Sequence, residues 1–111
     1  MNSRSDIDLT IDFTGALSVK WSGHANDRRP ANALNPLFQK LLDTKRYLRF
    51  DLSELSHMSS STLVVVMKFF KQLNELGVGF DLRFDQSVAW QRMTFSQLET
   101  LATPQQMQLA A

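Results

Sequence analysis

The sequence contains no cysteine, which excludes a disulfide framework, a thiolate zinc site and a cysteine nucleophile. It also lacks an excess of either charge, because 12 lysines and arginines stand against 11 aspartates and glutamates, for a net charge of +1. A chain so close to neutral has no electrostatic field that would favour nucleic acid or an anionic membrane surface. We therefore expect no nucleic-acid partner.

Long apolar runs are missing as well. The N-terminal stretch M-N-S-R-S-D-I-D-L-T is polar, without the apolar core of a signal peptide, and no later segment is long and uncharged enough to span a bilayer. We therefore expect a cytoplasmic protein with no direct membrane insertion. With 111 residues, 43% of them hydrophobic, the chain suffices for one core, so residues 1–111 are expected to form a single domain.

Alternating apolar and polar residues near the N-terminus predict a hairpin of two strands. Apolar residues alternate with acids and a threonine from Ile7 to Phe13, and with polar residues from Leu17 to Trp21. Thr14 and Gly15 between the two runs are typical of a turn. The hairpin should therefore have one apolar face and one wet face.

The middle of the chain predicts a helix, a buried strand and a second helix. Helical spacing of leucines and a phenylalanine indicates a first helix from about Ala33 to Asp43, with Pro36 in its first turn. The apolar-rich run from Tyr47 to Leu52 is typical of an interior strand. A second helix is expected from Leu63 to Leu76, ended by a glycine.

The C-terminal part predicts one more strand and one more helix. Apolar residues alternate with charged ones from Val78 to Phe84, and Ser87 has the character of an N-cap for a last helix with a possible break at Thr94 to Ser96. Helix-linked strands favour right-handed parallel crossovers. The expected fold class is α/β, with a mixed, mainly parallel sheet, an N-terminal antiparallel hairpin and helices packed against it.

Four adjacent hydroxyls, Ser59 to Thr62, lie between the predicted interior strand and the second helix. Functional loops gather at the carboxyl ends of strands in such sheets, and a helix N-terminus tolerates a phosphate. Ser59, Ser60 and Ser61 are therefore candidate phosphoacceptors, although the same hydroxyls could act as helix caps, worth about 1 kcal/mol each. A small hydrolase is the alternative of a different class, but no G-x-S-x-G motif supports it.

Two motifs carry a family resemblance that spans Leu17 to Leu101. The stretch V-K-W-S-G-H-A-N-D, which ends at Asp27, is similar to a family strand that ends in L-S-G-E-L-D. The stretch F-D-L-S-E-L-S-H-M-S-S-S-T-L, from Phe50 to Leu63, resembles an aliphatic strand followed by D-L-S and a hydrophobic-D-S-S-G-L signature. The chain thus resembles a STAS domain, the module shared by sulfate transporters and anti-sigma factor antagonists.

The resemblance assigns roles to the four hydroxyls one by one. The family's aspartate falls on Ser59, its phosphoacceptor on Ser60, its second serine on Ser61 and its glycine on Thr62. The chain therefore departs from the family pattern at two positions. Ser59 replaces a carboxylate, and Thr62 replaces a residue with greater backbone freedom.

The resemblance also implies a function. The protein would be a non-enzymatic regulator that needs no cofactor or metal, binds an anti-sigma factor with serine-kinase activity, and is switched by phosphorylation in the serine cluster. A non-phosphorylated adaptor or tail domain of an anion or lipid transport system is the alternative. The residues expected to contact the partner are Gly23, His24, Asn26, Asp27, Met58, Ser60, Ser61, Val64 and Lys68.

Overall fold

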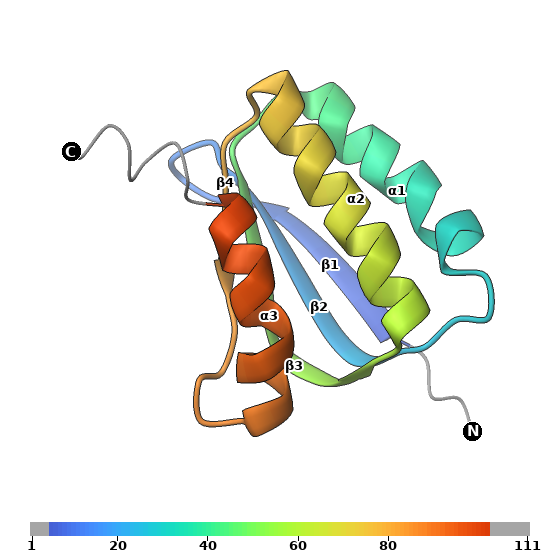
Figure 1. Cartoon of the computed structure of the whole chain (residues 1–111). Coiled ribbons are helices and arrows are strands. Elements are labelled where there is room, and N and C mark those ends of the chain that lie inside the picture. The colour runs from blue at the N-terminus through green and yellow to red at the C-terminus, as the bar shows by residue number, and fades with distance from the viewer. Residues whose placement is uncertain (1–4, 103–111) are drawn as a thin grey trace.

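The computed structural model describes residues 5–102, in which three helices lie on one side of a four-stranded sheet (Figure 1). The strands stand in the order β1-β2-β3-β4 across the sheet. β1 and β2 are antiparallel, whereas β3 and β4 continue the sheet in parallel with β2. This is the α/β fold class that the sequence predicts. In chain order the elements are β1 (Ser5–Ile11), β2 (Leu17–Ala25), α1 (Pro30–Thr44), β3 (Leu48–Met58), α2 (Ser60–Leu76), β4 (Phe80–Arg83) and α3 (Ala89–Ala102).

The core lies between the helices and one face of the sheet. In β2, Leu17, Val19 and Trp21 are buried, while Lys20 between them is exposed. The alternation arises because successive side chains of a strand point to opposite faces. At the centre, the ring of Phe50 on β3 contacts the phenylalanine rings of α2 and β4. These rings belong to Phe69, Phe70 and Phe80, with centroids 6.0, 5.0 and 6.3 Å from that of Phe50.

Two helix boundaries differ from the sequence prediction. α1 begins at Pro30, because a proline in the first turn presets the helical φ angle and its missing N–H would have no partner there. Pro36 therefore lies inside the helix and not in its first turn, at the expense of one backbone hydrogen bond. α2 begins at Ser60, three residues before the predicted start at Leu63.

The last helix is also simpler than predicted. α3 runs without a break through Thr94 and Ser96, where the Ser96 hydroxyl donates to the carbonyl of Arg92 one turn earlier. Ser87 lies in the turn before the helix, and its N–H and hydroxyl both donate to the carboxylate of Asp85, at 3.0 and 2.6 Å. The expected cap is therefore a turn residue.

β3 is longer than predicted and continues through Met58. Its pairing with β2 shifts register twice, so that β3 contains two more residues than the stretch of β2 opposite to it. The inserted residues change the spacing of the buried side chains from two to three, at Leu52, Leu55 and Met58. Strict alternation is thereby lost, and this is why the sequence suggested a loop after Leu52.

The side chain of Gln91 on α3 holds this second half of β3. It is 1% exposed, and its amide donates to the carbonyls of Ser53 and Leu55, at 3.1 and 2.9 Å. Its own carbonyl oxygen accepts from the N–H of Asp85 at 2.8 Å. Because β4 pairs only with residues 48–51 of β3, Gln91 satisfies backbone groups that a longer strand would have paired.

Within residues 5–102, no helix combines the length and the apolar character needed to cross a membrane.

Candidate functional site

The carboxyl ends of β2 and β3 meet beside the N-terminus of α2. Ala25 lies opposite Met58 in the parallel pairing, and the N–H of Ser59 donates to the Ala25 carbonyl at 2.9 Å. The loop after β2 and the start of α2, which the sequence analysis assigned to one site, are therefore adjacent. Both lie at the edge of the sheet where ligands and partners bind in open α/β folds.

Two histidines mark this edge. Gly23 has a φ angle of +88°, a left-handed conformation that glycine adopts without strain, and the register of β2 shifts directly after it. The shift places His24 opposite His57, with ring centroids 6.4 Å apart and both side chains exposed. The pairing of His57 with His24 was missed because β3 was predicted to end before His57. No signal in the sequence marks this pairing, because it depends on the register between β2 and β3.

The four hydroxyls have distinct environments. Ser59 is the N-cap of α2, and its hydroxyl oxygen accepts from the N–H of Thr62 at 3.2 Å. The same oxygen lies 2.8 Å from the Thr62 hydroxyl and 3.3 Å from that of Ser61. Ser59 is half-buried and Thr62 is 0% exposed, whereas Ser60 and Ser61 are exposed. Among the hydrogen bonds of the described residues, none holds the Ser60 hydroxyl.

The two departures from the family motif complement each other. Thr62 lies within the helix, and Lys45 is the only described non-glycine residue with a positive φ, so position 62 does not require the backbone freedom of glycine. The buried Thr62 hydroxyl needs a hydrogen-bond partner, which Ser59 supplies at 2.8 Å. Serine is also as good an N-cap as aspartate. The loop-to-helix junction is therefore intact without the carboxylate and the glycine.

Most of the predicted contact residues form one exposed surface. Val64 is 50% exposed, one turn beyond Ser60, and Lys68 is exposed one turn further along α2. Met58 is different, because it is 7% exposed and belongs to the core, so its side chain is not available to a partner. The role of the remaining residues in binding stays a prediction, and we refer to them together as the docking surface: Gly23, His24, Asn26, Asp27, Ser60, Ser61, Val64 and Lys68.

A groove of about 400 Å³ between α1 and α2 adjoins the docking surface. Lys68 and Val65 line it from α2, and Asn35 and Gln39 line it from α1, above the buried ring of Phe38. Besides these side chains, the apolar side chains of Leu42 and Phe69 also line the groove. No sequence pattern indicated it, because it depends on how the two helices pack.

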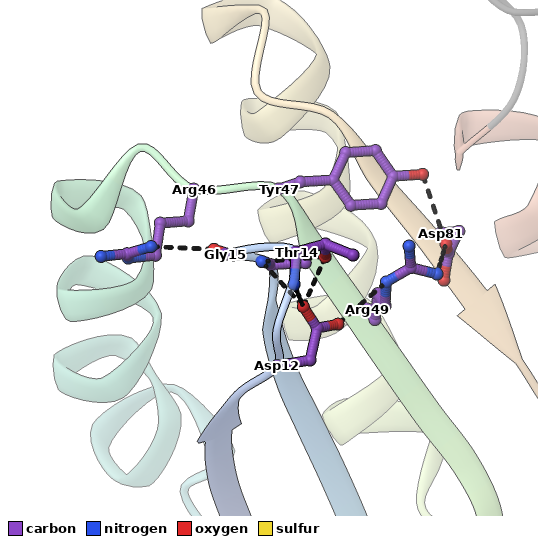
Figure 2. A network of polar contacts seen from close by, with 8 residues as sticks. Asp12, Thr14, Gly15, Arg46, Tyr47, Arg49 and Asp81 are labelled. Atoms are coloured by element: carbon purple, nitrogen blue, oxygen red, sulfur yellow. Dashed lines mark hydrogen bonds and ion pairs between the residues drawn. The ribbon is translucent and has the colours of Figure 1, made fainter.

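A polar network lies at the end of the sheet opposite the serine cluster, where it links the β1–β2 turn to β3 and β4 (Figure 2). The Asp12 carboxylate accepts from the N–H and the hydroxyl of Thr14 within the β1–β2 turn, and it pairs with Arg49 on β3 at 3.5 Å. Arg49 also pairs with Asp81 on β4 at 3.2 Å. The Thr14 hydroxyl, as the largest cause, holds the pKa of Asp12 below its ordinary value. These contacts join the β1–β2 turn to β3 and β4.

Comparison with known proteins supports the fold through a solved structure. No protein-family model matches the chain, and no curated protein sequence matches it. Among solved structures, the chain is similar to the crystal structure of an anti-sigma factor antagonist from Mycobacterium paratuberculosis, with a TM-score of 0.69 and 19% sequence identity. The similarity covers 90% of this chain and 84% of the other. The chain therefore has the fold of an anti-sigma factor antagonist, the STAS fold, as its sequence motifs indicated.

Proposed function

We propose that the protein is a non-enzymatic regulator that binds an anti-sigma factor through the docking surface. The observation that carries the proposal is the position of Ser60. Its hydroxyl is exposed at the first residue of α2, while the neighbouring Ser59 already caps the helix. The serine that the family motif designates as phosphoacceptor is thus free of a structural task, on a fold shared with an anti-sigma factor antagonist.

A phosphate on Ser60 would be accommodated without unfolding the helix. The first turn of α2 contains no acidic residue, and the N-terminal N–H groups of a helix interact favourably with negative charge. The modification would add roughly two negative charges to the docking surface. Because Val64 lies one turn away, the charged group would stand beside the apolar contact and weaken the complex. Phosphorylation by a partner with serine-kinase activity would therefore release that partner.

The test combines partner recovery with the mass of the endogenous protein in its native cell. We expect wild-type protein to recover an anti-sigma factor with kinase activity, and we expect one phosphate on a share of the endogenous chains. Ser60→Ala should abolish that phosphate, whereas Ser61→Ala, at a neighbour that is also exposed, should retain it. Val64→Lys should reduce partner recovery without altering the fold, because Val64 is half exposed.

Two results would contradict the proposal. Phosphate that persists in Ser60→Ala and disappears in Ser61→Ala would move the acceptor to another residue. Recovery of membrane transport subunits by an unmodified protein would favour an adaptor of a transport system, in which the serines serve only to form the helix start. A protein present in the cytoplasm and bound to an anti-sigma factor would support the regulatory function.

A further inference from the structure

β1 is the strand at one edge of the sheet, and within residues 5–102 it pairs with β2 alone. The register between them is unbroken along the whole strand, from Ser5 opposite Gly23 to Ile11 opposite Leu17. An outer strand of this kind presents a row of backbone N–H and C=O groups that an additional strand can pair with. At seven residues, β1 is long enough to align a partner strand.

The two edge strands of the sheet, β1 and β4, differ strongly in how they are protected against the addition of another strand. On the far side, β4 contains only four residues, and Gln91 occupies the backbone carbonyls of β3 beyond it. Soluble proteins usually protect an outer strand with proline, charged side chains (especially lysine), a bulge or a covering element. Among these devices the sequence of β1 supplies only two aspartates, which repel an acidic strand and attract a basic one. β1 contains no proline or lysine, and its pairing with β2 has no bulge. The edge of the sheet formed by β1 is therefore open to the addition of another strand.

The side chains of β1 define the chemistry of what could bind there. Leu9 and Ile11 lie opposite the buried Val19 and Leu17, on the helix side of the sheet, yet they are 43% and 59% exposed. Phe13, in the turn directly after the strand, is 100% exposed. The apolar side of β1 thus extends the core surface beyond the area that the helices cover.

The other side of β1 is acidic. Asp6 and Asp8 are both exposed, and Asp8 lies opposite Lys20, whose own ion pair is with Glu54 at 3.0 Å. A strand added to β1 would therefore meet apolar side chains on one face and carboxylates on the other. Opposite charges on directly facing residues stabilise a strand pair, and like charges destabilise it.

These charges argue against a second copy of the chain as the occupant. Antiparallel pairing of two β1 strands centred on Asp8 would place the two Asp8 carboxylates opposite each other, and centring on Ile7 would place Asp6 opposite Asp8. Centring on Leu9 would instead place Asp8 opposite Thr10. Parallel pairing in register would align every acid with itself. The two registers centred on Asp8 and Ile7 and the parallel pairing all set like charges against each other on the acidic face, so most registers of a second copy are disfavoured.

The geometry points to β1 as a second binding surface, which adds an extended segment of a partner protein whose apolar residues alternate with lysine or arginine. The apolar residues of that segment cover Leu9 and Ile11, and its cations face Asp6 and Asp8. Backbone hydrogen bonds supply affinity and the alternating side chains supply specificity, as in other cases of strand addition. The inference does not depend on Ser60 or on the docking surface.

The probe is a synthetic seven-residue peptide of alternating valine and lysine, which matches the length of β1. When the peptide is added to the full chain, nuclear magnetic resonance should show changed backbone chemical shifts and slower amide exchange within Ser5–Ile11. A peptide of alternating valine and glutamate is the matched control and should bind at least about tenfold more weakly, as expected for a difference of roughly 1.4 kcal/mol. Exchanging Asp6 and Asp8 for lysine should reverse this preference.

Variants of the apolar side complete the test. Leu9→Lys with Ile11→Lys introduces the protection that outer strands usually carry and should abolish the effect of the peptide. Leu76→Lys, at an apolar residue that is 62% exposed on α2, should leave it unchanged. Equal binding of both peptides, shift changes confined to other elements, or a dimer of the chain that pairs through β1 would each overturn the inference.

Discussion

Replacing Gln91 with leucine is the sharpest test of how the structure holds the candidate site. Gln91 is 1% exposed and makes three hydrogen bonds, two from its amide to the carbonyls of Ser53 and Leu55 and one from the Asp85 N–H to its side-chain oxygen. Leucine is close in size but has no polar atom. All three backbone groups would therefore lose their partner while the packing is largely retained.

The expected loss can be worked from these bonds. A buried hydrogen bond contributes about 1 kcal/mol, and leaving a buried backbone group unpaired costs about 1–3 kcal/mol. Ser53 and Asp85 lie near the surface, where water can replace part of the loss, so about 3 kcal/mol in total is a reasonable value. Native domains have roughly 5–15 kcal/mol of stability. At about 4 °C per kcal/mol, Tm should fall by about 12 °C.

Urea unfolding followed by circular dichroism measures this difference. Gln97→Leu is the matched control, because the same substitution is made on the same helix at an exposed residue, and its effect should stay within about 0.5 kcal/mol. Amide exchange should in addition become faster at Asp85, whose N–H loses the side-chain oxygen of Gln91 as its acceptor. If Gln91→Leu were as stable as Gln97→Leu, the inference that Gln91 replaces the missing strand partner of β3 would be refuted.

Two further predictions concern the start of α2 and the turn between β1 and β2. Ser59→Ala should lower the free energy of unfolding by about 1 kcal/mol or more, because the helix loses its cap and the buried Thr62 hydroxyl loses its partner. Ser60→Ala should change the free energy of unfolding by no more than about 0.5 kcal/mol. Equal losses in urea unfolding would contradict the roles assigned to the two serines. The lowered pKa of Asp12 means that its carboxylate stabilises the fold above its ordinary pKa of 3.8 and that this contribution is lost as the pH falls below 3.8. Thermal unfolding at neutral pH and at about pH 3 should therefore show a smaller acid-induced loss of stability in Asp12→Asn than in wild type, and an unchanged loss would show that this carboxylate contributes nothing.

Regular periodicity explains which elements the sequence predicted correctly. The alternation from Ile7 to Trp21 and the helical spacing in α2 both reflect one buried face, so the hairpin and that helix follow from local pattern. β3 departs from this rule, since its two register shifts put buried residues three apart. Bulges are set by pairing with a neighbouring strand, and a single strand's sequence does not reveal them.

In the candidate site, too, some features follow from the local sequence and others depend on tertiary contacts. The serine cluster was recognised at a helix start, because hydroxyl residues before an apolar run are a local signal. Which hydroxyl caps the helix was not predictable, since it depends on the turn that brings the oxygen of Ser59 within 3.2 Å of the Thr62 N–H. The burial of Met58 likewise results from the extension of β3 beneath the helices.

The sequence by itself determined the order of strands and helices, the apolar face of each, and the resemblance to the STAS family, because these depend on residue type and spacing within one segment. Only the tertiary structure decided which residues from different parts of the chain lie next to each other. It placed His24 beside His57, opened a groove between α1 and α2, protected one side of the sheet with Gln91 and left β1 exposed on the other. These features join residues far apart in the chain, and their geometry follows from packing that no single segment encodes.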